Sequence, residues 1–223
     1  MEIKRVIARG AEAIIYEGYF LGIHSIFKKR LVKNYRNNEL DKLINSQRTV
    51  LEAKLMFSAL KNGINVPAIL YVDKDNYLIV MEYIEGEVVR EILTRDSTSL
   101  DIGKLGEWIG SIAGKLHSIG IVHGDFTTNN LILSQDGELF LIDFGLAKRS
   151  DKIEDMATDV HVFLRSLESV HYKIKDYIFE NFIKGYKTVN PRVNEVLKKM
   201  REIRLRGRYV SERKKSLLRN NES

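Results

Sequence analysis

The feature that most constrains this 223-residue chain is a stretch near its middle where two acidic loop motifs each follow a short apolar run. The first motif is His123-Gly124-Asp125, and Asn130 follows its aspartate by five residues. The second motif, Asp143-Phe144-Gly145, begins 13 residues beyond Asn130. Residues 131–142 between them have the pattern of two short strands around a turn that contains glycine. We therefore expect a β-hairpin that returns Asp143 to the side of Asn130.

The polar side chains of these motifs are those that phosphoryl transfer requires. That reaction needs a carboxylate near the attacking hydroxyl and oxygen ligands that hold Mg²⁺ on the phosphates. Asp125 fits the carboxylate, whereas Asn130 and Asp143 fit the metal ligands. Either aspartate alone could simply cap a turn, but both motifs at this spacing favour the catalytic interpretation.

On these motifs the chain resembles the protein kinase superfamily. The resemblance implies an α+β fold with a β-rich N-lobe and a reduced helical C-lobe, and it implies ATP and Mg²⁺ (or Mn²⁺) as cofactors. Residues 79–86 look like the kinase hinge, whose backbone pairs with adenine. The implied contacts are Met81 as gatekeeper, the Glu82 carbonyl and the Ile84 amide.

A kinase also needs a lysine on its third strand, paired with a helix glutamate, to hold the α- and β-phosphates. Lys28 is the best candidate because the adjacent Lys29 should face the opposite side of a strand. The partner should be Glu52. In place of a G-x-G-x-x-G loop the chain has Gly10-Ala11-Glu12, whose backbone amides can approach phosphate and whose Glu12 we expect to shield the nucleotide.

Several departures from ordinary protein kinases concern the acceptor side. Gly124 replaces the usual arginine of the catalytic loop, and Thr127 stands where many kinases have a lysine on the γ-phosphate. No A-P-E motif follows Gly145. The phospho-acceptor should therefore be held differently from the peptide of an ordinary protein kinase.

Three stretches narrow the resemblance to the small RIO-like kinases of the KEOPS complex: Gly10–Ala13, Lys28–Arg36 and Arg204–Arg208. The resemblance implies an atypical Ser/Thr kinase that is also an ATPase. It further implies two kinds of protein partner, which are the other KEOPS subunits and an ASKHA-fold subunit that makes threonylcarbamoyladenosine in tRNA.

Five further residues also have expected roles. Asp159 should bond the backbone of the catalytic loop from a following helix, and His123 should be a packed residue rather than a proton carrier. Tyr35, Arg36 and Arg48 are predicted to contact a partner or a phosphate, although a solvated face explains them equally well.

Positive charge is concentrated at the C-terminal end. The chain has 36 Lys and Arg against 30 Asp and Glu, and residues 192–223 alone hold 11 of the former and 4 of the latter. Such a segment has non-specific affinity for nucleic acid, so we expect it to contact tRNA; a solvated tail is the alternative. The expected organisation is an N-lobe over residues 1–85, a reduced C-lobe over 86–200 and a basic tail over 201–223.

Hydrophobic periodicity gives the approximate secondary structure. Residues beyond about 155 read as helical. Strands are expected over Ile3–Ala8, Ala13–Phe20, Ile23–Phe27, Ala68–Val72, Tyr77–Met81, Leu131–Leu133 and Leu139–Ile142, and helices over Ser46–Lys61 and Leu105–His117.

Composition excludes several classes. The absence of Cys removes disulfides and thiol catalysis, and no apolar run approaches the roughly 18 residues of a membrane span. The first residues show no signal-peptide pattern, so we expect a cytoplasmic protein without membrane contact.

Two other functions compete with the kinase and ATPase interpretation. Small-molecule phosphotransferases of the aminoglycoside or choline type also use a His-Gly-Asp loop, but the Asp143-Phe144-Gly145 motif and the short helical part argue against them. A tRNA-binding scaffold without turnover would not need Lys28, Asp125, Asn130 or Asp143.

Overall fold

The computed structural model describes residues 1–33, 37–95 and 100–220, with side chains as far as residue 206. Tyr35 and Arg36, for which contacts were expected, lie outside the described residues.

Two compact units make up the chain. The first consists of Met1–Ile92 together with Asn129–Lys148, and the second of Leu93–Thr128 together with Arg149–Ser223. The segment with Asn130 and Asp143 therefore packs within the N-terminal unit, whereas Asp125 belongs to the second unit.

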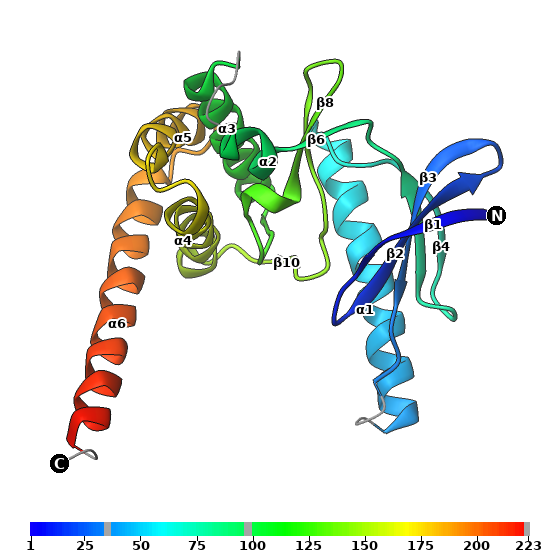
Figure 1. Ribbon diagram of the computed structural model, residues 1–223, viewed down its shortest axis with the longest axis horizontal. Coiled ribbons are helices and arrows are strands. Elements are labelled where there is room, and N and C mark those ends of the chain that lie inside the picture. Colours follow the sequence, from blue (N-terminus) through cyan, green and yellow to red (C-terminus); the bar gives the residue numbers. More distant parts are fainter. Residues whose placement is uncertain (34–36, 96–99, 221–223) are drawn as a thin grey trace. The chain divides into compact units, whose positions relative to one another are not determined.

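The larger sheet of the first unit is antiparallel and has five strands in the spatial order β1-β2-β3-β5-β4. Figure 1 labels β1 to β4 of this sheet. The strands are β1 (Glu2–Arg9), β2 (Ala13–Phe20), β3 (Ile23–Arg30), β4 (Ile69–Asp73) and β5 (Leu78–Glu82). All five were expected, but β3 continues three residues further than predicted. Lys28 and Arg30 end its apolar pattern, yet both side chains are buried, so the charged residues concealed the end of the strand.

Helix α1 (Asn38–Lys61) packs against β4 and β5 and ends before Gly63, which has a φ of +71°. The prediction that it begins at Ser46 was wrong by two turns. The side chain of Asn37 caps the true start by accepting a hydrogen bond from the Glu39 amide at 2.9 Å. Hydrophobic periodicity missed this start because the buried residues in the first half of the helix are polar: Asp41, Asn45, Thr49 and Glu52. Leu51 and Leu60, two apolar residues of the same helix, are exposed.

A second, three-stranded sheet of the first unit has the order β6-β8-β9. Its strands are β6 (Gly86–Val88), β8 (Leu131–Ser134) and β9 (Leu139–Leu141). The short helix η1 (Thr128–Asn130) leads into β8, and α2 (Val89–Thr94) follows β6. β8 and β9 form the predicted hairpin, and the Ile142 amide donates to the Asn130 carbonyl at 2.9 Å. The expected return of the chain to Asn130 is confirmed.

The second unit is helical, as its sequence predicted. It contains α3 (Ile102–Ser118), α4 (Ile153–Val170), α5 (Lys175–Val189) and α6 (Val193–Asn220), with the short strands β7 (Ile121–Val122) and β10 (Lys148–Arg149) beside the entry to α4. Helices α3 and α5 approach backbone to backbone. A Cβ added at Gly110 would collide with the Phe182 carbonyl, and one at Gly185 with the Glu107 carbonyl, so glycine is required at both contacts.

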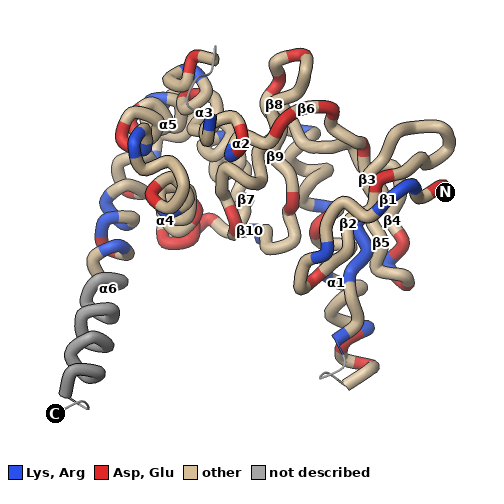
Figure 2. The backbone as a smooth tube through the Cα atoms, viewed as in Figure 1, with Lys and Arg blue, Asp and Glu red and all other residues tan. Residues whose placement is uncertain are grey.

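Residues 201–220 continue α6 without a break from Val193. Arg204 pairs with Glu168 at 2.5 Å and Arg206 with Glu154 at 3.1 Å, both on α4. Figure 2 shows the matching basic residues on α6 and acidic residues on α4. Part of the basic stretch is thus attached to the helical unit through ion pairs.

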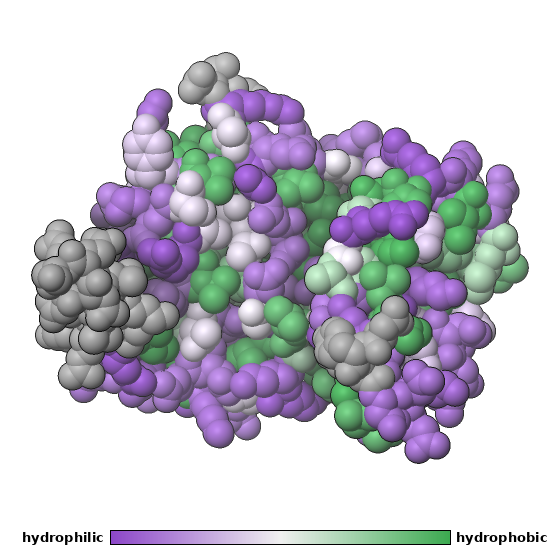
Figure 3. All heavy atoms as spheres, turned by 60° about the horizontal axis from the view of Figure 1, so that its bottom comes forward, coloured by the Kyte–Doolittle hydropathy of each residue, from purple (hydrophilic) through white to green (hydrophobic). Residues whose placement is uncertain are grey.

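On the face shown in Figure 3, hydrophobic residues form small separate patches among polar ones. Within the described part of the chain, no helix combines the length and apolar character needed to cross a membrane.

Candidate active site

A cavity of about 340 Å³ lies within the first unit. Its walls are mainly apolar and come from both sheets: Ile7, Ile15, Ile26, Met81, Ile132 and Ile142. The polar side chains that line it include Lys28, Glu52, Asn130 and Asp143. An apolar cavity of this size with a few convergent polar groups is typical of a small-molecule site.

Residues 82–86 lead from β5 to β6 along the cavity. Met81 is buried, and Glu82 and Ile84 also line the cavity wall. The ring of Tyr83 stacks on His24 of β3 with 4.0 Å between ring centroids, and the Tyr83 amide donates to the His24 carbonyl at 3.2 Å. The segment expected to be the hinge is therefore fixed to the sheet.

Lys28 is the centre of a charged cluster. Its Nζ lies 2.5 Å from Oε1 of Glu52 and 2.6 Å from Oδ1 of Asp143. Lys28 and Glu52 are buried, whereas the Asp143 side chain is 52% exposed. Lys29, on the opposite side of β3, is exposed. The structure thus brings Lys28, Glu52 and Asp143 together.

Sequence reasoning missed Arg30 in this cluster. Its Nη2 donates to Oε2 of Glu52, so both carboxylate oxygens of Glu52 have a cationic partner. Arg30 and Glu52 are both buried. The signal was present, because residues 28 and 30 of a strand share a face, but Arg30 was considered only as part of the stretch Lys28–Arg36.

Asp143 has an uncommon backbone. Its φ is +61°, in the left-handed region that few residues other than glycine adopt. The Gly145 amide donates to Oδ1 of Asp143 at 3.1 Å and helps to hold this conformation. Strain of this kind is concentrated at functional sites. Among the described residues no three His, Asp or Glu side chains converge as a metal site, but a kinase holds Mg²⁺ with fewer side chains and the phosphates themselves.

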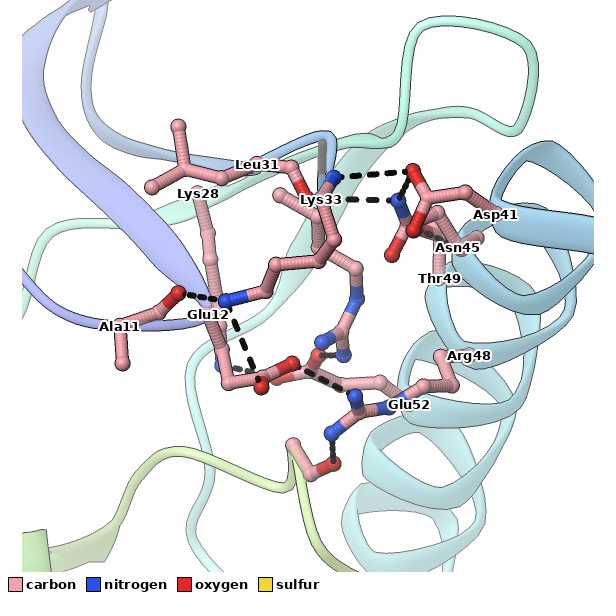
Figure 4. Close-up of polar contacts among 12 residues, drawn as sticks. Ala11, Glu12, Lys28, Leu31, Lys33, Asp41, Asn45, Arg48, Thr49 and Glu52 are labelled. Carbon is pink, nitrogen blue, oxygen red and sulfur yellow. Dashed lines mark hydrogen bonds and ion pairs between the residues drawn. The ribbon is translucent and has the colours of Figure 1, made fainter. Parts of the chain in front are cut away.

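The turn between β1 and β2 is held toward α1 (Figure 4). Oε2 of Glu12 accepts from Arg48 at 2.6 Å, and Lys33 donates to the Ala11 carbonyl. Nη2 of Arg48 donates to the Gly145 carbonyl at 3.3 Å. The turn itself, Gly10-Ala11-Glu12, is absent from the residues that line the cavity. The structure therefore gives Arg48 partners within its own unit, and it turns the Glu12 carboxylate toward α1.

The catalytic-loop motif lies in the second unit, where Asp159 of α4 organises it. Oδ2 of Asp159 accepts from the His123 amide at 2.5 Å, and Oδ1 accepts from the Gly124 amide at 2.8 Å. The expectation for Asp159 is confirmed. Asp125, the next residue, has an exposed side chain.

Buried polar groups extend behind Asp159. Nε2 of His117 lies 3.2 Å from its carboxylate, and Nδ1 of His117 lies 2.8 Å from the Tyr186 hydroxyl. Burial raises the pKa of Tyr186, which therefore stays protonated. His123 is fully buried and its Nδ1 accepts from the Asp125 amide at 3.3 Å, as expected for a packed residue.

Comparisons with known proteins agree with this architecture. The family model of the protein kinase domain matches residues 1–166. A solved structure of the Rio2 kinase–ADP/Mg²⁺–phosphoaspartate complex from Chaetomium thermophilum superposes with a TM-score of 0.64 at 15% identity, covering 95% of this chain and 72% of that one. The chain therefore has the protein kinase fold, with a β-sheet N-lobe and a helical C-lobe.

Sequence relatives narrow the class. The KEOPS complex subunit Bud32 of Pyrococcus abyssi is 43% identical over 213 residues, which cover 92% of this chain and 96% of that protein. A probable bifunctional tRNA threonylcarbamoyladenosine biosynthesis protein of Methanococcus maripaludis strain C7 is 42% identical, over 93% of this chain but only 36% of its own length. The chain belongs to the Bud32 family of protein kinases.

Proposed function

We propose that this protein binds ATP with Mg²⁺, acts as an atypical Ser/Thr kinase and ATPase, and supports threonylcarbamoyladenosine modification of tRNA as a KEOPS subunit. The observation that carries the proposal is the bridging position of Lys28. Its ammonium contacts both Glu52 and Asp143 where the apolar cavity meets its polar side chains. An apolar volume beside a buried cation is suited to a base attached to phosphates.

In this proposal the adenine ring lies between the apolar walls. Met81 limits the depth of the cavity, while the Glu82 carbonyl and the Ile84 amide pair with the base. The support is that all three residues line the cavity.

The phosphates lie at the polar side chains. Lys28 holds the α- and β-phosphates and Glu52 orients Lys28. The backbone of the β1–β2 turn at Gly10, Ala11 and Glu12 covers the phosphates, while the Glu12 carboxylate stays paired with Arg48. Asn130 and Asp143 hold Mg²⁺, or Mn²⁺ in its place, and both are oxygen donors suited to a hard cation. The metal supplies neutralisation of the charge that develops on the phosphates.

Asp125 directs the proton of the attacking group. The two hydrogen bonds that Asp159 accepts from the His123 and Gly124 amides fix the backbone before it, so the exposed Asp125 side chain starts from a rigid position. Because Gly124 and Thr127 lack the cationic side chains of ordinary kinases, we propose that water competes with a Ser or Thr hydroxyl at this position, which gives both ATPase and kinase activity.

The partners follow from the relatives. In the bifunctional proteins about a third of the length matches this chain, which supports a working complex with an ASKHA-fold threonylcarbamoyladenosine synthase subunit and other KEOPS subunits. We propose that residues 201–223 contact tRNA through their positive charge. The ion pairs of Arg204 and Arg206 with α4 neutralise part of that charge. A cytoplasmic location completes the proposal.

The test follows γ-labelled ATP with Mg²⁺, using the wild type, Asp143→Ala and the control Asp176→Ala, with and without the synthase subunit and tRNA. Asp176 is exposed on α5. Label on Ser or Thr that disappears only in Asp143→Ala establishes a kinase, and release of labelled phosphate with the same dependence establishes an ATPase. If neither activity depends on Asp143 in any mixture, the enzyme proposal fails and a tRNA-binding scaffold remains.

A further inference from the structure

We propose that Arg30 is a positioning residue for the phosphoryl-transfer site, holding Glu52 in place so that Glu52 can orient Lys28 when Lys28 engages a nucleotide. The inference rests on the proposed ATP-dependent function. Arg30 itself does not touch the nucleotide in this scheme; it acts through Glu52.

The geometry divides the two oxygens of Glu52 between two cations. Lys28 lies on Oε1 at 2.5 Å and Arg30 bonds Oε2. Both cations project from the same face of β3, as their i, i+2 spacing requires, and Figure 4 shows Lys28 and Glu52 in this network. Two residues of one strand therefore each bind one carboxylate oxygen of Glu52.

Arg30 stands on a fixed backbone. It pairs with Ala13 of β2, and its amide donates to the Tyr77 carbonyl at 3.0 Å. Its guanidinium also reaches the Asp143-Phe144-Gly145 segment, because a Cβ added at Gly145 would lie 3.9 Å from Nη2 of Arg30 and 3.3 Å from Nζ of Lys28. Arg30 is therefore close to Gly145 and has a fixed backbone.

The charge balance explains why a second cation is useful. Lys28 is shared between Glu52 and Asp143 in this structure. Phosphates that enter the cavity would compete for the same ammonium, and a Glu52 held by Lys28 alone would then lose part of its compensation. A buried carboxylate with weakened pairing is costly and tends to reorient. Arg30 keeps one oxygen paired throughout, so the other remains directed at Lys28.

Burial supports a specific role for the guanidinium. The Arg30 side chain is 2% exposed, and its Nε is a buried donor for which the described residues offer no hydrogen-bond acceptor. Retaining an arginine with one unsatisfied donor is unfavourable for stability alone. Its bond to Glu52 is the compensating feature.

The experiment compares wild type, Arg30→Met, Arg30→Lys and the control Arg5→Met. Arg5 lies on the same sheet in an exposed pair with Glu17, so Arg5→Met removes the same charge without touching the cluster. Turnover of γ-labelled ATP is measured well below the melting temperature and normalised to the concentration of sites that bind Mg·ADP. Because misfolded protein does not enter this normalisation, a purely structural role would leave kcat per site unchanged.

The expected result for Arg30→Met is a fall in kcat per site of about tenfold or more with a KM for ATP within about threefold, because the apolar contacts with the base persist. Arg30→Lys should recover most of the kcat, and Arg5→Met should match the wild type. In a Glu52→Gln background Arg30→Met should have little additional effect on kcat, since its action passes through Glu52.

An unchanged kcat per site in Arg30→Met, or full additivity with Glu52→Gln, overturns the positioning role while leaving the proposed function intact. If Arg30→Met fails to fold, Arg30→Gln is judged by the same criteria. A wild type that neither binds nor hydrolyses ATP removes the proposed function, and the role of Arg30 with it.

Discussion

Each unit buries a carboxylate that is held by several groups, but the partners differ in kind. Glu52 of the first unit is paired with two cations, one of which it shares with the half-exposed Asp143. Asp159 of the second unit accepts two backbone amides and lies beside His117. A shared cation can change partners when a ligand arrives, whereas bonds from the backbone cannot be exchanged without unfolding the loop. The first arrangement is suited to ligand binding and the second to holding a loop rigid.

The largest expected effect tests the catalytic-loop backbone that Asp159 holds in the second unit. Asp159→Ala leaves the buried amides of His123 and Gly124 without their acceptor and removes a partner of His117, so we expect a loss of about 3 kcal/mol or more in the free energy of unfolding. Urea denaturation measures it. Glu180→Ala, an exposed carboxylate on α5, serves as the control and should change stability by less than about 0.5 kcal/mol. Equal stabilities of the two variants would show that Asp159 does not hold the loop.

The next largest effect tests the shared cation of the first unit by measuring stability and activity separately. The side chain of Asp143 is half exposed, so its pair with Lys28 is partly screened. We expect Asp143→Ala to lower the free energy of unfolding by no more than about 1 kcal/mol while Mg²⁺-dependent ATP turnover is lost. Urea denaturation and the labelled-ATP assay on the same preparation measure both quantities. A destabilisation as large as that of Asp159→Ala would erase the difference between the two regions.

The parts of the molecule that sequence could predict were those with local signals. The hairpin of β8 and β9 followed from alternating apolar residues around a turn with glycine, and the loop role of Asp159 followed from its position after the second motif. The start of α1 did not, because its buried face carries Asp41, Asn45 and Thr49. Two of those side chains have hydrogen-bond partners outside the helix: Asn45 donates to the Leu31 carbonyl at 3.4 Å, and Asp41 accepts from the Lys33 amide at 3.2 Å. Hydrophobic periodicity does not register such contacts.

The candidate site shows the same division. The pairing of Lys28 with Glu52 could be inferred because strand alternation and the kinase resemblance agreed. The pairing of Arg30 with the same carboxylate could not, because no local pattern tells whether a charged residue at a strand end turns inward. Likewise the contact between Glu12 and Arg48 joins residues 36 positions apart, and only the folded unit shows it.

The smallest expected effect concerns His161, which shares α4 with Asp159. Burial lowers the pKa of His161 below its usual 6.5, the neighbouring Arg165 and Arg204 lower it further, and Glu168 opposes them. The unfolded chain therefore binds more protons than the folded one as the pH falls below 6.5, so the contribution of His161 to stability is complete above that pH and is lost toward the lowered folded value. We expect His161 to lower the free energy of unfolding at acid pH by less than about 1 kcal/mol, because solvent screens the charges around it. Urea denaturation at pH 7.5 and 5.5 of wild type and His161→Gln isolates it, because every other group is the same in both proteins. A variant with the same loss of stability at pH 5.5 as the wild type would show that His161 does not contribute, whereas a smaller loss would show that α4 carries a titrating face in addition to the pH-independent backbone contacts of Asp159.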